Sequence, residues 1–361
     1  MNRKIKNVFP GGNTSEGFYS FYEEVLSKLD RLFILKGGPG TGKSSLIKKV
    51  AKHFLERGQS ITFLHCSSDT ESVDGVIINE LSLGVVDGTA PHVVDPTLPG
   101  IKDEIINLGE FWDRNLLLED KEEITRLKQN IKTYFSTAYK ELKYATIAQN
   151  KMKKIYVPHI DNAKVEEIKD KLISMTLKDK ESSKKKGRLS QSFAGAITPR
   201  GIVSFAGELT DNLSTRVLLL GKPGTNKSTI MESLADKATS LGYDVEAYHC
   251  ALNPHKLDLV IIPQKQIAFV DASPPHKFVS KSSNDILVDM FALTVPKEIA
   301  QQNQKQILNL QRQVDKHILK ATSNIKNAKE NHAKMENFYI KAMDFDKMQE
   351  VFERIIHGET N

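Results

Sequence analysis

Two glycine-rich segments, GGPGTGKS at residues 37–44 and GKPGTNKS at 221–228, constrain this 361-residue chain more than any other feature. Each follows a short apolar run and precedes apolar residues at helical spacing. A strand, a glycine loop and a helix in that order direct backbone N–H groups and the positive end of a helix dipole at an anion. The segments therefore predict two phosphate-binding loops, each between a buried strand and a helix.

The first segment has the residue that the phosphate-loop pattern requires at every position. Glycines let the backbone approach phosphate oxygens without a Cβ clash, the lysine reaches the phosphates, and the serine hydroxyl binds Mg²⁺. We expect the nucleotide to be bound by Gly37, Gly38, Pro39, Gly40, Thr41, Gly42, Lys43, Ser44 and Ser45. Lys43 is also a candidate catalytic residue, and Ser44 is a candidate Mg²⁺ ligand.

The second segment departs from the pattern at one position. Asn226 replaces the glycine before the lysine, while the lysine and the serine are retained. We expect nucleotide binding by Gly221, Lys222, Pro223, Gly224, Thr225, Asn226, Lys227, Ser228 and Thr229, with Ser228 as a Mg²⁺ ligand. Because Asn226 changes the backbone where the helix begins, we expect a degenerate second site that binds nucleotide. It is a regulatory site if Asn226 prevents hydrolysis, and the substitution is only sequence drift if both sites hydrolyse nucleotide.

Both segments belong to a duplication of nearly the whole chain. An offset of 184 residues aligns Phe9 with Phe193 and continues without a gap past both loops. An offset of 183 then aligns two apolar stripes whose spacings of three and four predict long helical arms. The predicted fold is α/β, with two tandem P-loop NTPase domains and mainly parallel sheets. The predicted units are domains 1–177 and 191–361, a basic linker 178–190, and helical arms 121–156 and 299–339.

The basic charge of the chain is concentrated in the linker. The formal net charge is +6, and residues 178–190 hold six basic and two acidic residues. This favours a solvated linker over nucleic-acid binding, with a polyanion-binding tether as the alternative. No apolar run approaches the roughly 20 residues that cross a bilayer, and no signal-type apolar core follows the N-terminus. We therefore expect a soluble, cytoplasmic protein with no membrane partner.

Acids at strand ends are candidates for holding Mg²⁺ beside the loops. Asp87 and Asp271 each end an apolar run, although both also fit turn-forming positions, and Asp87 is in addition a candidate catalytic residue. The glutamate that often follows such an aspartate is absent, since Gly88 and Ala272 stand there. His65, at the end of another predicted strand, is the candidate catalytic base, and a packed core histidine is its alternative.

Further motifs support a family resemblance. His-Cys pairs end equivalent strands at 65–66 and 249–250, and the segments DGTAPH and DASPPH occupy 87–92 and 271–276. With its two loops and tandem repeat, the chain resembles a bacterial family of tandem P-loop ATPases, whose members are labelled ATPase or nucleotide kinase. The resemblance covers nearly the full length and implies two nucleotide-binding α/β domains, ATP binding and a cytoplasmic location.

The sequence thus predicts an ATP-binding, Mg²⁺-dependent ATPase in which nucleotide state changes the relation between two domains. The arms then transmit the change or contact a protein partner, or they form a helical seam between the halves. Arg200 is a candidate arginine finger because its repeat counterpart, Glu16, has the opposite charge. A nucleotide or small-molecule kinase and a nucleotide-gated binding module with little turnover are the alternative functions.

Overall fold

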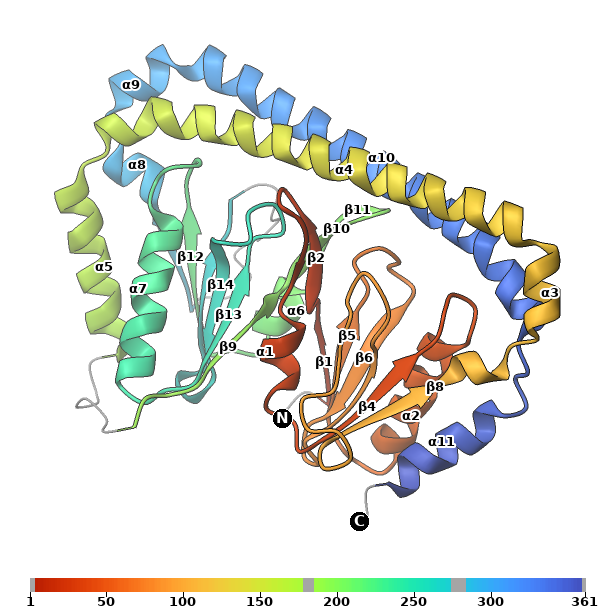
Figure 1. Ribbon diagram of the computed structural model, residues 1–361. Coiled ribbons are helices and arrows are strands. Elements are labelled where there is room, and N and C mark those ends of the chain that lie inside the picture. The colour runs from red at the N-terminus through yellow and green to blue at the C-terminus, as the bar shows by residue number, and fades with distance from the viewer. Residues whose placement is uncertain (1–3, 178–184, 274–283, 359–361) are drawn as a thin grey trace.

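The computed structural model describes residues 4–177, 185–273 and 284–358 and contains two α/β halves beneath a pair of long helices (Figure 1). The first half has a six-stranded sheet in the order β1-β5-β6-β7-β4-β8. Its strands are β1 (Ile5–Val8), β5 (Ile61–His65), β6 (Val73–Ile78), β7 (Leu83–Asp87), β4 (Arg31–Lys36) and β8 (Asp103–Asn107). Strand β6 runs antiparallel to both neighbours and the other pairs are parallel, so the sheet is mixed and mostly parallel.

The second half repeats this sheet in the order β9-β13-β14-β15-β12-β16. Its strands are β9 (Leu189–Phe193), β13 (Val245–His249), β14 (Leu257–Ile262), β15 (Ile267–Asp271), β12 (Thr215–Leu220) and β16 (Asp285–Asp289). Here β14 is the antiparallel strand. The α/β prediction with mainly parallel sheets is confirmed. Strand β9 begins inside the predicted linker, whose residues 178–184 lie outside the described part of the chain.

Each half places its glycine loop between a buried central strand and a helix. Strand β4 leads through the first glycine loop (37–42) into α2 (Lys43–Glu56). Strand β12 leads through the second glycine loop (221–226) into α7 (Lys227–Ser240). The inner residues of β4 and β12 are buried, and each helix buries one apolar stripe against its sheet. Burial of both surfaces fixes the position of the loop at the carboxyl end of the strand.

The two halves meet through equivalent residues. Phe9 and Phe193 exchange backbone hydrogen bonds of 2.9 Å in each direction, and their rings share a buried cluster with Phe21. Two hairpins extend from this junction, β2 (Gly11–Thr14) with β3 (Gly17–Ser20) and β10 (Gly195–Thr198) with β11 (Gly201–Ser204). Contact between repeat-equivalent residues is the signature of a two-fold arrangement, here within one chain.

The helical arms pack on each other across both halves. Helices α4 (Lys121–Tyr156) and α10 (Gln304–Ala342) run antiparallel, and the fully buried Ala138 and Ala321 lie in their shared seam. At 1.5 Å per residue each helix is roughly 55 Å long. This is the seam that the sequence offered as one role for the arms. None of the described helices combines the length and apolar character needed to cross a bilayer.

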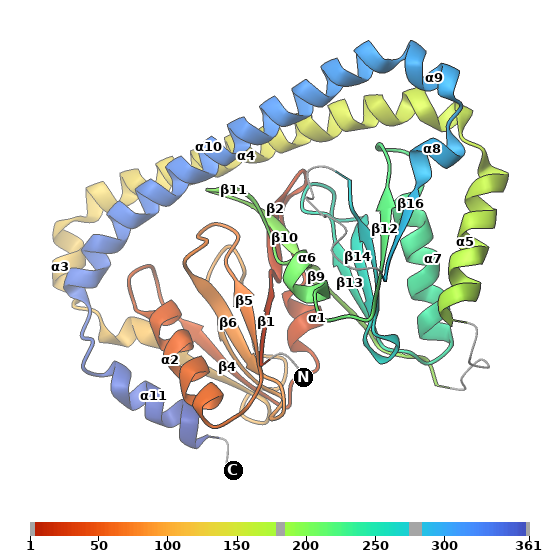
Figure 2. The ribbon, with the colours of Figure 1, turned by 180° about the vertical axis from the view of Figure 1, so that it is seen from behind.

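Each arm carries its next helix to the opposite half (Figure 2). Helix α5 (Asn162–Leu177) follows α4 and packs on α7, with Val165 and Leu172 in the apolar core of the second half. Helix α11 (Met348–His357) follows α10 and packs on α2, with Phe352 in the core of the first half. Residues 162–177, grouped with the first repeat by sequence, therefore complete the second half in space.

Short elements link these parts. They are the helices α1 (Tyr22–Leu26), α3 (Arg114–Glu119), α6 (Ala206–Thr210), α8 (Met290–Thr294) and α9 (Lys297–Gln302), and the 3₁₀ turns η1 (Leu108–Phe111), η2 (Val157–His159) and η3 (Pro263–Lys265). Helix α3 precedes α4 beside the end of α10, and α9 precedes α10. The arms thus enter the helical seam from the two halves at opposite ends.

Candidate functional site

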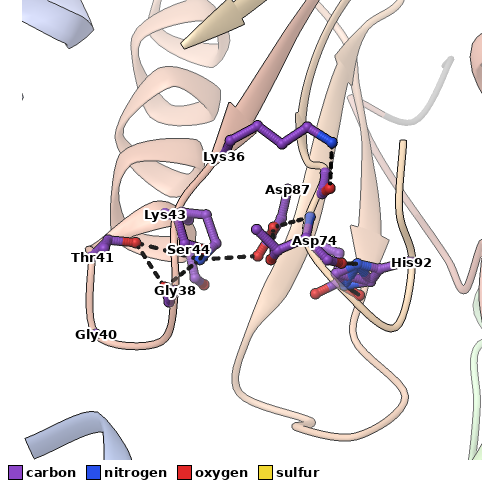
Figure 3. Close-up of polar contacts among 12 residues, drawn as sticks. Lys36, Gly38, Gly40, Thr41, Lys43, Ser44, Asp74, Asp87 and His92 are labelled. Carbon is purple, nitrogen blue, oxygen red and sulfur yellow. Dashed lines mark hydrogen bonds and ion pairs between the residues drawn. The ribbon is translucent and has the colours of Figure 1, made fainter. Parts of the chain in front are cut away.

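The first glycine loop wraps around the ammonium group of Lys43 (Figure 3). Lys43 Nζ donates to the carbonyl oxygens of Gly37 at 2.8 Å and Gly38 at 2.7 Å. The same nitrogen lies 3.5 Å from a carboxylate oxygen of Asp87, at the end of β7. Gly40 and Gly42 have φ values of +71° and +77°, which L side chains rarely adopt. The structure therefore brings Lys43 and Asp87 together at the first glycine loop.

The second glycine loop repeats this geometry despite its substitution. Lys227 Nζ donates to Gly221 O at 2.6 Å and lies 3.6 Å from Asp271. Asn226 has φ +58°, in the left-handed region that Gly42 also occupies. Asparagine is among the non-glycine residues that enter this region most readily. The replacement of glycine by Asn226 thus leaves the path of the loop intact.

The serines after both lysines are held by the neighbouring antiparallel strand. Ser44 Oγ accepts a hydrogen bond of 3.1 Å from the Val73 N–H, and Ser228 Oγ accepts one of 3.0 Å from the Leu257 N–H. Their remaining lone pairs and the carboxylates of Asp87 and Asp271 are the oxygen donors at each loop. Of the other predicted residues, Ser45 is exposed on α2, and Thr229 lines a cavity beside the second loop.

A second carboxyl in the first half, that of Asp74, is buried and lies close to Asp87. Asp74 on β6 accepts a hydrogen bond of 3.0 Å from the Tyr22 hydroxyl and lies 3.2 Å from His92 Nε2. Burial raises the pKa of Asp74 to about 6, His92 lowers it, and the nearby Asp87 raises it. A carboxyl whose pKa lies near neutrality can accept a proton at physiological pH. The sequence analysis gave the role of base to His65 instead.

His65 lies at the junction of the halves, away from Lys43 and Asp87. Its Nε2 is 2.9 Å from Asn7 Oδ1, and its ring lies 4.7 Å from that of Phe205. Burial lowers the pKa of His65 to about 4. None of the contacts described for this side chain involves the first glycine loop. Its surroundings match the packed-histidine alternative, since the end of β5 faces the other half.

The helix α10 closes over the first glycine loop. The Gly40 N–H donates a hydrogen bond of 3.2 Å to Glu336 Oε1, a residue 296 positions away. A Cβ atom placed on Gly40 would lie 2.8 Å from the Glu336 carbonyl oxygen and 3.0 Å from Ile340. The Trp112 and Tyr339 rings flank Gly38. A carboxylate therefore takes a loop N–H group, and the helix backbone contacts the loop directly.

The helix α4 approaches the second glycine loop in the same way but with another side chain. A Cβ atom placed on Gly224 would lie 3.2 Å from Cα of Lys153. Lys153 and Lys256 line a cavity of about 200 Å³ together with the loop, Ser228 and Asp271. At the offset of 183, Lys153 is the counterpart of Glu336. Sequence reasoning missed both residues, although aligning Met152 with Met335 places this charge reversal at the next position.

The described residues contain no group of three or more His, Cys, Asp and Glu side chains arranged to hold a metal ion. The two glycine loops, each with a lysine, a serine and an acid, are the strongest candidate sites in the part of the chain that the structure covers. Comparison with known proteins identifies no relative, since no family model, curated protein or solved structure matches this chain.

Proposed function

We propose that this chain binds ATP with Mg²⁺ at both glycine loops and hydrolyses it. The observation that carries the proposal is the repeated lysine–acid pair, with Lys43 at 3.5 Å from Asp87 and Lys227 at 3.6 Å from Asp271. In both halves the ammonium group lies inside the loop, where it can meet the β- and γ-phosphates of a nucleotide. The presence of this arrangement in both copies of the repeat, despite the substitution at Asn226, favours a phosphate-binding role over a structural turn.

The oxygen donors at each loop fit Mg²⁺. This ion is usually held by one or two protein oxygens together with phosphates and water, without a dedicated protein cage. Ser44 with Asp87, and Ser228 with Asp271, supply such oxygens beside each lysine. Held there, Mg²⁺ would neutralise the negative charge that develops on the phosphates during phosphoryl transfer.

Asp74 is the proposed proton acceptor in the first half. Its pKa of about 6 leaves it mostly ionised at neutral pH, and it lies beside Asp87. Water attacks the γ-phosphorus, the bond from that phosphorus to the bridging oxygen breaks, and ADP leaves. The proton of the attacking water passes to Asp74, whose neighbour His92 at 3.2 Å stabilises the ionised carboxyl beforehand.

Phosphate release from MgATP tests this function. The double variant Lys43→Ala/Lys227→Ala is expected to lose turnover by about 100-fold or more, because it removes both cations that face the phosphates. The control is Lys52→Ala, since Lys52 is exposed on α2. Wild-type turnover in the double variant, or equal loss in the control, would contradict the proposal.

A further inference from the structure

Two lysines from outside the second glycine loop face its cavity. Lys153 comes from α4, an arm that begins in the first half, and Lys256 precedes β14. In the described part of the chain, neither lysine forms an ion pair with a carboxylate. Burial lowers the pKa of Lys153, and the charge of Lys256 lowers it further. Two neighbouring ammonium groups repel each other, so this pair is stabilised when an anion lies between them.

The acids of the same cavity are already engaged elsewhere. Asp271 pairs with Lys227 at 3.6 Å, Glu232 accepts a hydrogen bond of 2.8 Å from Ser228, and Asp258 interacts with the Cys250 thiol. Asp271 and Glu232 thus contact the lysine and the serine that follow the loop, and Asp258 contacts the thiol that follows β13. Lys153 and Lys256 are therefore two cations, besides Lys227 of the loop, that face a ligand in this cavity without a carboxylate partner of their own among the described residues.

The repeat shows that this positive pair is particular to the second half. The counterparts of Lys153 and Lys256 in the first half are Glu336 and Ser72. Glu336 accepts the hydrogen bond of the Gly40 N–H, which is the kind of donor that a phosphate oxygen takes. At equivalent positions of the two arms, α10 thus places a hydrogen-bond acceptor over the first loop and α4 places a cation over the second.

We propose that Lys153 and Lys256 bind the phosphates of the nucleotide at the second glycine loop, so that the arm α4 forms part of that site. This inference rests on the proposed nucleotide binding and assigns to it two residues from beyond the loop. Because α4 also spans the first half, a nucleotide at the second loop contacts a helix that is packed on both halves.

Calorimetric titration with MgATP tests the proposal in a Lys43→Ala chain, which reports mainly on the second loop. Adding Lys153→Ala or Lys256→Ala is expected to weaken MgATP binding about tenfold each, the typical effect of losing one charge-assisted hydrogen bond. Inorganic pyrophosphate, titrated in parallel, is expected to lose affinity by a similar factor. Lys153→Arg keeps the charge and is expected to retain affinity within about threefold.

The matched control is Lys154→Ala, at an exposed neighbour on the same helix. Unchanged MgATP affinity in this control, together with an unchanged unfolding temperature in all variants, supports a direct role for Lys153 and Lys256. If Lys227→Ala abolishes binding while Lys153→Ala and Lys256→Ala leave it within twofold, the inference is overturned and the proposed function stands. If the Lys43→Ala chain binds no MgATP, both are overturned.

Discussion

The two glycine loops share a backbone and differ in the arm that covers them. In both, a lysine is held by loop carbonyls and lies near an acid, at 3.5 Å in the first and 3.6 Å in the second. Over the first loop, Glu336 accepts the Gly40 N–H, whereas over the second Lys153 lines an open cavity. The loop that fits the motif at every position is thus the one closed by a carboxylate. The fit of a loop to the motif therefore does not indicate whether its N–H groups are free of protein acceptors.

The largest expected effect comes from reversing the charge over the first loop. In a Lys227→Ala chain, Glu336→Lys is expected to raise MgATP affinity about 100-fold, because it removes a competing carboxylate and adds a cation. Glu336→Gln is expected to raise MgATP affinity about tenfold. Calorimetric titration measures both, with exposed Glu330→Gln on the same helix as the control. Unchanged affinity in Glu336→Lys would show that the helix itself, and not the carboxylate, closes the loop.

The buried carboxyl of the first half makes stability depend on pH. Asp74 has a pKa of about 6 when folded and 3.8 as its ordinary value, so the folded state binds its proton more tightly. The free energy of unfolding is therefore expected to fall between pH 4 and pH 6, by about 2 to 3 kcal/mol relative to Asp74→Asn. Urea unfolding across this range measures the difference. The control is exposed Asp236→Asn, and a difference that rises with pH would contradict the assignment.

The seam between α4 and α10 is expected to link the two sites. Ala138→Leu inserts a larger side chain at a fully buried position, and it should lower the free energy of unfolding by about 1 to 3 kcal/mol. Separating the helices also moves Lys153 and Glu336 from their loops, so MgATP affinity should fall at the second loop and rise at the first. Exposed Ala333→Leu on α10 is the control for urea unfolding and titration. If MgATP affinity changed in the same direction at both loops, the opposite roles of Lys153 and Glu336 would be refuted.

The smallest effect is expected at a charge pair that is reversed between the halves. Arg200 pairs with exposed Glu71, and the equivalent Glu16 pairs with His255 at 2.9 Å. Because such surface pairs contribute little, Arg200→Ala should lower the free energy of unfolding by less than about 1 kcal/mol and leave ATP turnover unchanged. Turnover assays and urea unfolding check both. A steep loss of turnover with normal ATP affinity would instead identify Arg200 as an arginine finger.

Local sequence patterns predict the strand, the glycine loop and the helix that form both candidate sites. The apolar run of β4 and the glycines after it determine a strand, a loop and a helix, and the duplication predicts the second copy. Asp87 could also be placed, because the end of β7 is adjacent to β4 in the sheet. These predictions concern residues whose surroundings come from nearby segments.

The remaining features depend on segments far apart in the chain. An apolar stripe such as that of α5 suits either sheet equally, so the repeat alone does not show that it crosses to the other half. The surroundings of His65 could not be read from the sequence, because the end of β5 faces the junction, which only the packing of the halves determines. Glu336 contacts Gly40 because the long helix α10 brings it back to the first half. No local spacing in the sequence indicates this contact.

MgATP titration of Lys43→Ala and Lys227→Ala side by side tests most directly whether the second loop is the more receptive site. Since Lys153 and Lys256 face only the second loop, Lys227→Ala is expected to remove the tighter binding and Lys43→Ala to retain it. Loss of the tighter binding in Lys43→Ala with its retention in Lys227→Ala would contradict this assignment of the two sites.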